Sequence, residues 1–99
     1  MDERTARRRE PASVAELAGT RVWTVTASKG WWLTAERTVE AHGRRWVVGL
    51  TPTAGGLTAL MLWRDDVVVS HRRGPESVLC GLAAHWVTNL LAGRAWDAA

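Results

Sequence analysis

Hydrophobic and polar residues alternate along residues 21–51, a pattern typical of β-strands that bury one face. The alternation runs through Arg21–Ser28, Trp31–Ala41 and Arg44–Thr51. Lys29-Gly30 and His42-Gly43 separate these segments and suit tight hairpin turns. The sequence therefore predicts successive antiparallel strands.

The next part of the chain predicts one or two further strands. Leu57–Trp63 is apolar on both faces apart from Thr58, as expected for a central strand. Thr51–Gly56 contains a proline and two glycines and predicts a loop. Asp65-Asp66 then suits a tight turn into Val67–His71.

The periodicity changes to helical spacing near Pro75 and stays helical to Ala92. Pro75 suits the first helical position, Glu76 complements the helix dipole, and Gly93 suits the end. The apolar positions cover more than half of the helix circumference, which is wider than the stripe of an ordinary surface helix. They are Val78, Leu79, Leu82, Ala83, Trp86, Val87, Leu90 and Leu91, with Cys80 and Ala84 at the margin.

So wide an apolar arc predicts a second contact beyond the sheet. We expect the outward side of the helix, at Ala84, Val87 and Leu91, to meet the N-terminal helix, a second copy of the chain or another protein. Trp32 is out of phase with the apolar positions of its strand, so it is a further candidate for a partner or dimer interface.

The N-terminal part predicts a polar tail over Met1–Pro11 and a short helix capped by Ser13, with Glu16 three residues on. The predicted fold class is α+β: an antiparallel four- to five-stranded meander sheet with a short N-terminal helix and one long C-terminal helix packed on one face. A single domain is expected over residues 12–95, followed by a tail over residues 96–99. Four tryptophans fall in apolar phase and are expected in the core: Trp23, Trp31, Trp46 and Trp86.

Composition narrows the function classes. The single cysteine, Cys80, excludes an internal disulfide, and the sequence has no Cys/His spacing of a zinc site. No apolar run is long enough for a membrane span, so we expect no membrane partner and a cytoplasmic location. No cofactor or metal is expected.

The net charge of +3 rests mainly on arginine, and the acidic residues are interspersed with it. Arg72 and Arg73 precede the helix and could bind an anion there. Arg44, Arg45 and Arg37 could add phosphate contacts for single-stranded or nonspecific nucleic acid, with Trp32 for stacking.

Candidate catalytic groups are few. His42, His71 and His85 fall on separate elements, and Cys80 is expected to be an inert buried thiol. The sequence therefore predicts a small non-enzymatic regulatory or interaction module, dimeric and acting by binding another protein. The alternatives are a nucleic-acid-binding module and a small-molecule or catalytic pocket between helix and sheet.

Overall fold

A computed structural model describes residues 13–28 and 32–99, without the side chains of Ser28 and Trp32. The predicted tail over Met1–Pro11, the Lys29-Gly30 turn and the core position of Trp31 lie outside the described residues.

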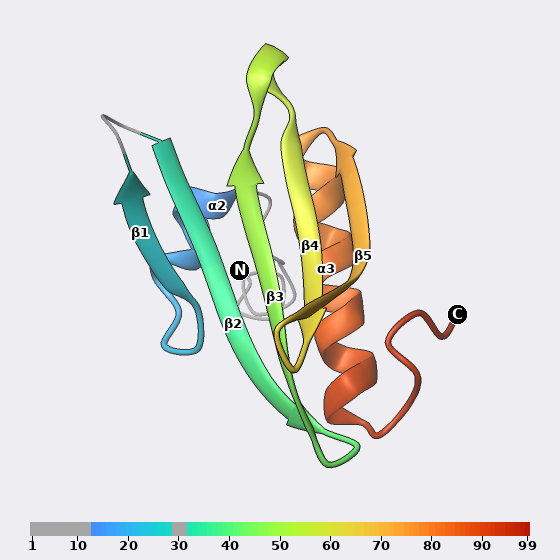
Figure 1. The fold of residues 1–99 in the computed structure, drawn as a ribbon. Helices are drawn as coiled ribbons and strands as arrows, with labels where there is room; N and C mark the ends of the chain where they lie inside the picture. Colours follow the sequence, from blue (N-terminus) through green and yellow to red (C-terminus); the bar gives the residue numbers. More distant parts are fainter. Residues whose placement is uncertain (1–12, 29–31) are drawn as a thin grey trace, which may run out of the picture.

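Five strands form one antiparallel sheet in the order of the sequence, as Figure 1 shows. They are β1 (Thr24–Ser28), β2 (Trp32–Ala41), β3 (Arg44–Pro52), β4 (Thr58–Arg64) and β5 (Val67–Gly74). The α+β meander predicted from the sequence is confirmed, with five strands.

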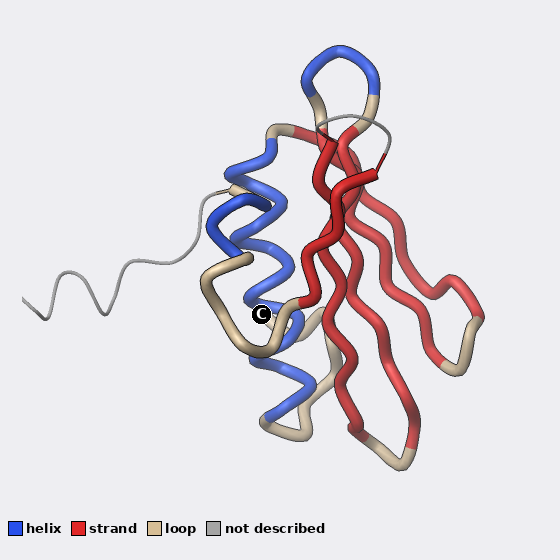
Figure 2. The backbone as a smooth tube through the Cα atoms, turned by 90° about the vertical axis from the view of Figure 1, so that its left-hand side faces the viewer, coloured by secondary structure: helices blue, strands red, loops and turns tan. Residues whose placement is uncertain are grey.

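Both helices of the described residues lie on the same face of the sheet (Figure 2). The short helix α2 (Val14–Leu17) contacts β1 and β2, and the long helix α3 (Glu76–Leu91) contacts β2, β3, β4 and β5. The Ser13 hydroxyl accepts a hydrogen bond from the Glu16 amide, which confirms the predicted cap of α2. A 3₁₀ turn, η1 (Ala54–Gly56), lies in the predicted loop between β3 and β4.

Two element ends differ from the prediction. β5 continues to Gly74, because Arg72 and Arg73 pair with β4, so these arginines are strand residues and do not lead into the helix. Pro75 is the N-cap of α3 and not its first helical residue.

The two described hairpin turns have the backbone that tight hairpins need. His42 and Gly43 both have positive φ, as do Asp65 and Asp66, which matches the two central positions of a type I′ turn. Asparagine, aspartate and glycine tolerate this conformation best, and the prediction of turns at both places is confirmed.

The core lies between the sheet and the helices. Trp46 and Trp86 are buried in it, as predicted, whereas Trp23 is only half-buried at its margin. The buried apolar side chains of the core come from the sheet and from both helices. They are Val14, Leu17, Ala35, Val39, Trp46, Val48, Leu50, Leu60, Leu62, Leu79, Cys80, Ala83, Trp86, Val87 and Leu90.

Asn89 is a polar residue of α3 that is fully buried, with an exposed fraction of 0%. Its amide nitrogen donates to the carbonyl oxygens of Trp96 and Ala98, at 2.8 and 3.0 Å, and its oxygen accepts two hydrogen bonds from Arg94. These bonds hold the last residues of the chain against α3, where Trp96 packs edge-on against Trp86.

Candidate interaction groove

An apolar groove lies on the helix side of the molecule, between α3, the segment joining α2 to β1, and the middle of β2. We call it the α3 groove. Its volume is about 280 Å³. It is lined by Leu17, Thr20, Val22, Trp23, Arg37, Cys80, Ala84, Val87, Thr88 and Leu91.

The predicted interface residues of the helix all line this groove. Val87 is buried at 4% exposure, and Ala84 is half-buried beside it. Leu91 is 61% exposed at one end, and Val22 is 52% exposed on the segment before β1. The side chain of Trp32, the fourth predicted interface residue, lies outside the described residues.

Arg37 is the charged residue of the groove lining. It lies on β2 between Ala35 and Val39, which are both buried under the helices, so it occupies a position on the helix-covered face. Its side chain is half-buried, and among the residues that the structure describes it has no hydrogen-bond or ion-pair partner. The groove thus combines apolar walls with one uncompensated guanidinium.

Cys80 lies in the same lining and is buried. Burial raises the pKa of the Cys80 thiol to about 11, and the negative charges of Glu76 and Glu16 act in the same direction. The thiol is therefore protonated at neutral pH and is a poor nucleophile. Within residues 13–28 and 32–99, no three His, Cys, Asp or Glu side chains gather as metal ligands.

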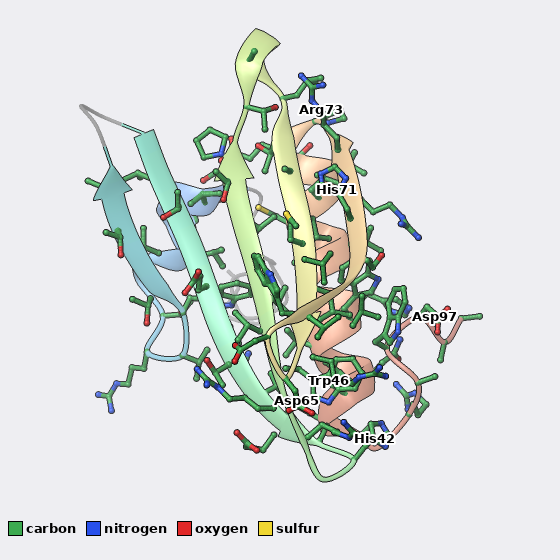
Figure 3. All side chains as sticks on the ribbon, in the orientation of Figure 1. His42, Trp46, Asp65, His71, Arg73 and Asp97 are labelled. Carbon is green, nitrogen blue, oxygen red and sulfur yellow. The ribbon has the colours of Figure 1, made fainter. Side chains whose placement is uncertain are left out.

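The other arginines predicted to bind anions do not share a surface. Arg44 donates to the Asp65 carboxylate at 2.9 Å, and the Arg72 guanidinium lies 6.0 Å from the centre of the Trp86 ring. Arg73 donates to the Thr53 hydroxyl and to the Ala54 carbonyl, near the β3–β4 loop. Figure 3 shows Arg73 at one end of the sheet and Asp65 at the other.

One of these arginines, Arg44, is bound to the turn between β4 and β5. Asp65 accepts from the Arg44 guanidinium and from the backbone amide of Arg45, at 2.9 and 3.1 Å. These two hydrogen bonds lower the pKa of the Asp65 carboxyl. Arg44 therefore already has a carboxylate partner.

Two further cavities lie elsewhere on the molecule. One, of about 430 Å³, lies between α2, the β3–β4 loop and the start of α3, and its carboxylate, Glu76, already accepts from the Val14 amide at 2.7 Å. The other, of about 290 Å³, lies on the sheet face away from the helices, lined by charged residues together with Val47 and Trp63.

Neither Trp63 nor Val22 was predicted from the sequence to be a surface feature. Trp63 covers Gly49 of the neighbouring strand, where an added Cβ would lie 2.9 Å from the indole ring. A glycine inside an otherwise apolar strand is the sequence signal for such a close approach. Val22 gave no comparable signal. It was predicted to lie in the first strand, but β1 begins only at Thr24.

Comparison with protein-family models, with curated proteins and with solved structures finds no match for this chain. Among the helices of the described residues, none has the length and apolarity needed to cross a membrane.

Proposed function

We propose that this chain is a protein-interaction module that binds another protein in the α3 groove and catalyses no reaction. The observation that carries the proposal is the pair of exposed apolar side chains, Val22 and Leu91, at the rims of a groove whose floor is apolar. Exposed large apolar side chains that adjoin one another around a concavity are typical of protein contact sites.

Burial of these side chains favours association. Complete burial of a valine or leucine side chain contributes about 1.5 to 3 kcal/mol, and both are already partly covered. Each therefore adds about 1 kcal/mol when a partner covers it. The protonated Cys80 thiol suits the same role, because it contributes an apolar surface to the groove.

The chain offers a matched pair of variants to test this function. Val67, at the β4–β5 turn, is 62% exposed, as much as Leu91, but does not line the groove. We expect Leu91→Asp to reduce at least tenfold the amount of partner protein recovered with the chain from its native cells, because a carboxylate would face the apolar groove. Val67→Asp should leave recovery unchanged. Equal recovery with both variants would contradict the proposal.

Sedimentation of the purified chain separates two forms of this interaction. A homodimer through the groove, which the sequence favours, sediments at twice the mass of 10.9 kDa and dissociates in Leu91→Asp. A chain that binds a different protein stays monomeric when pure, and only its complex is sensitive to Leu91→Asp.

A further inference from the structure

β1 pairs with only part of β2, and this leaves an open edge beside the groove. The pairing between the two strands ends at Thr24 and Glu36, whereas β2 runs on to Ala41. We call Arg37–Ala41 the β2 step. Figure 1 shows it as the lower half of β2, where no described strand lies on the β1 side. On its other side the step pairs with β3.

The register shows which backbone groups face the open side. The carbonyl of Arg45 accepts from the Asp65 amide, so the Arg45 backbone points towards β4. The direction of the backbone N–H and C=O groups alternates along a strand. Those of Trp46 therefore point towards β2, where Trp46 lies opposite Val39. Along the step, Val39 therefore bonds to β3, while the N–H and C=O groups of Thr38 and Glu40 point away from β3 to the open edge.

Side-chain alternation places the α3 groove under the same step. Arg37 and Val39 face the helix side, and Arg37 lines the groove together with Val87 and Leu91. A strand added to the step would alternate in the same way, with every second side chain directed into the groove and the others onto the helix-free face.

A second copy of this chain fits the step poorly. Antiparallel pairing centred on Val39 brings the His42-Gly43 turn of the second copy opposite Glu36, a place that Thr24 already occupies. Pairing centred on Glu40 avoids this collision but sets two Glu40 carboxylates directly opposite each other. Like charges in that arrangement destabilise a sheet.

We infer that the α3 groove takes an extended segment of a different protein, which adds to the β2 step as a sixth strand and carries a carboxylate for Arg37. This inference rests on the proposed function and names the class of its partner. The open groups of Thr38 and Glu40 supply main-chain hydrogen bonds. The apolar lining selects alternating apolar side chains, and the unpartnered guanidinium selects an acidic one.

A short synthetic peptide tests the inference with the whole chain in solution. The probe is acetyl-Val-Lys-Glu-Thr-amide, whose first residue lies opposite Ala41 in the antiparallel orientation and whose last lies opposite Thr38, clear of Thr24. Its glutamate lies opposite Val39 and reaches the diagonal neighbour Arg37. Its lysine then lies opposite Glu40. We expect saturable shifts of the Thr38 and Glu40 amide signals in an NMR titration, with a dissociation constant of about 1 mM or tighter. No saturable change up to about 5 mM peptide overturns the inference.

Backbone methylation separates strand addition from simple apolar contact. Methyl groups on the amide nitrogens of the lysine and threonine of the peptide block the hydrogen bonds to the step, and should weaken binding at least about tenfold. A methyl group on the glutamate nitrogen, which points away from β2, should change binding less than about twofold. Equal effects of the two modifications overturn strand addition.

The carboxylate is tested by a double exchange. Arg37→Gln should weaken binding of the glutamate peptide about tenfold. The peptide with glutamine in place of glutamate should bind the wild-type chain and Arg37→Gln equally, provided that the NMR spectrum shows the variant folded. If the glutamate peptide binds both chains equally, the assigned role of Arg37 is wrong.

The two proposals fail in different ways. If the methylated peptides bind alike but Leu91→Asp still loses its partner, strand addition is wrong and the groove remains the interaction site. If Leu91→Asp changes neither the recovery of the partner protein nor the binding of the peptide, the α3 groove is not the interaction site and the proposed function is wrong.

Discussion

Asn89 shows how one buried polar side chain organises a terminus. Its amide and its oxygen together fix Arg94, Trp96 and Ala98, and the His85 ring adds a bond of 2.8 Å to the Ala98 carbonyl. Because that carbonyl only accepts, His85 carries a proton on Nε2. The sequence predicted a tail over residues 96–99 but not its packing against Asn89. Helical periodicity cannot reveal that a tail returns to cover a polar residue.

We predict that Asn89→Ala lowers the free energy of unfolding by about 2 kcal/mol, because it removes a buried hydrogen-bond centre and frees the C-terminal residues. Urea unfolding measures this loss, and carboxypeptidase digestion reports release of the terminus. His85→Ala, which removes only one bond from the same segment, is the control and should cost less than about 1 kcal/mol. Equal losses in the two variants would show that Asn89 does not organise the terminus.

At the scale of elements, a charged residue of the β4–β5 turn links this turn to β3. Asp65 bonds to Arg44 and to the backbone of Arg45, both on β3, and its positive φ is one that Asn also tolerates. The pKa of Asp65 lies below its ordinary value of 3.8 in the folded chain, chiefly because of the Arg44 hydrogen bond. Its contribution to stability is therefore present above pH 3.8 and is lost as the pH falls through the folded-state pKa.

We predict that the wild-type chain is more heat-stable than Asp65→Asn near neutral pH, and that the difference shrinks to zero in strong acid. Melting temperatures of the two proteins across the range from pH 7 to about pH 2 test this, since the other carboxyl groups titrate in both. A constant difference at all pH values would mean that the Asp65 charge has no part in the stability of the turn.

Strand lengths show where sequence patterns stop being informative. The alternation predicted a first strand from Arg21, but pairing begins at Thr24, because the chain is still bending after α2. Thr20 donates from its hydroxyl to the Leu17 carbonyl at 2.8 Å, within that bend. The open β2 step follows from this late start, and alternation alone does not give the residue at which two strands cease to pair.

At the scale of the whole molecule, the meander and the helix on one face follow from patterns that each element carries locally. Alternation, turn residues and helical spacing predict the order of elements, and the three helix residues predicted as an interface, Ala84, Val87 and Leu91, line one groove. The groove itself depends on three elements distant in sequence. Its second wall, at Val22, had no local signal. Arg37 was predicted as an anion-binding residue, but its place beside the apolar walls of the groove is set by tertiary packing.

The same packing explains why the arginines do not act together. They are spread over β2, β3 and β5, and the alternation of each strand sends neighbouring ones to opposite faces. Arg44 and Arg45 are successive residues of β3 and are separated in this way. The sequence did not predict the same separation for Arg72 and Arg73, because they were expected before the helix and not in β5.

Photo-cross-linking in the native cells tests whether another protein occupies the α3 groove. A photoreactive amino acid replaces Leu91 in one chain and Val67 in another, two positions with nearly equal exposure. We predict a covalent adduct with one different protein from position 91 and none from position 67. Adducts of equal yield from both positions, or none from position 91, would contradict it.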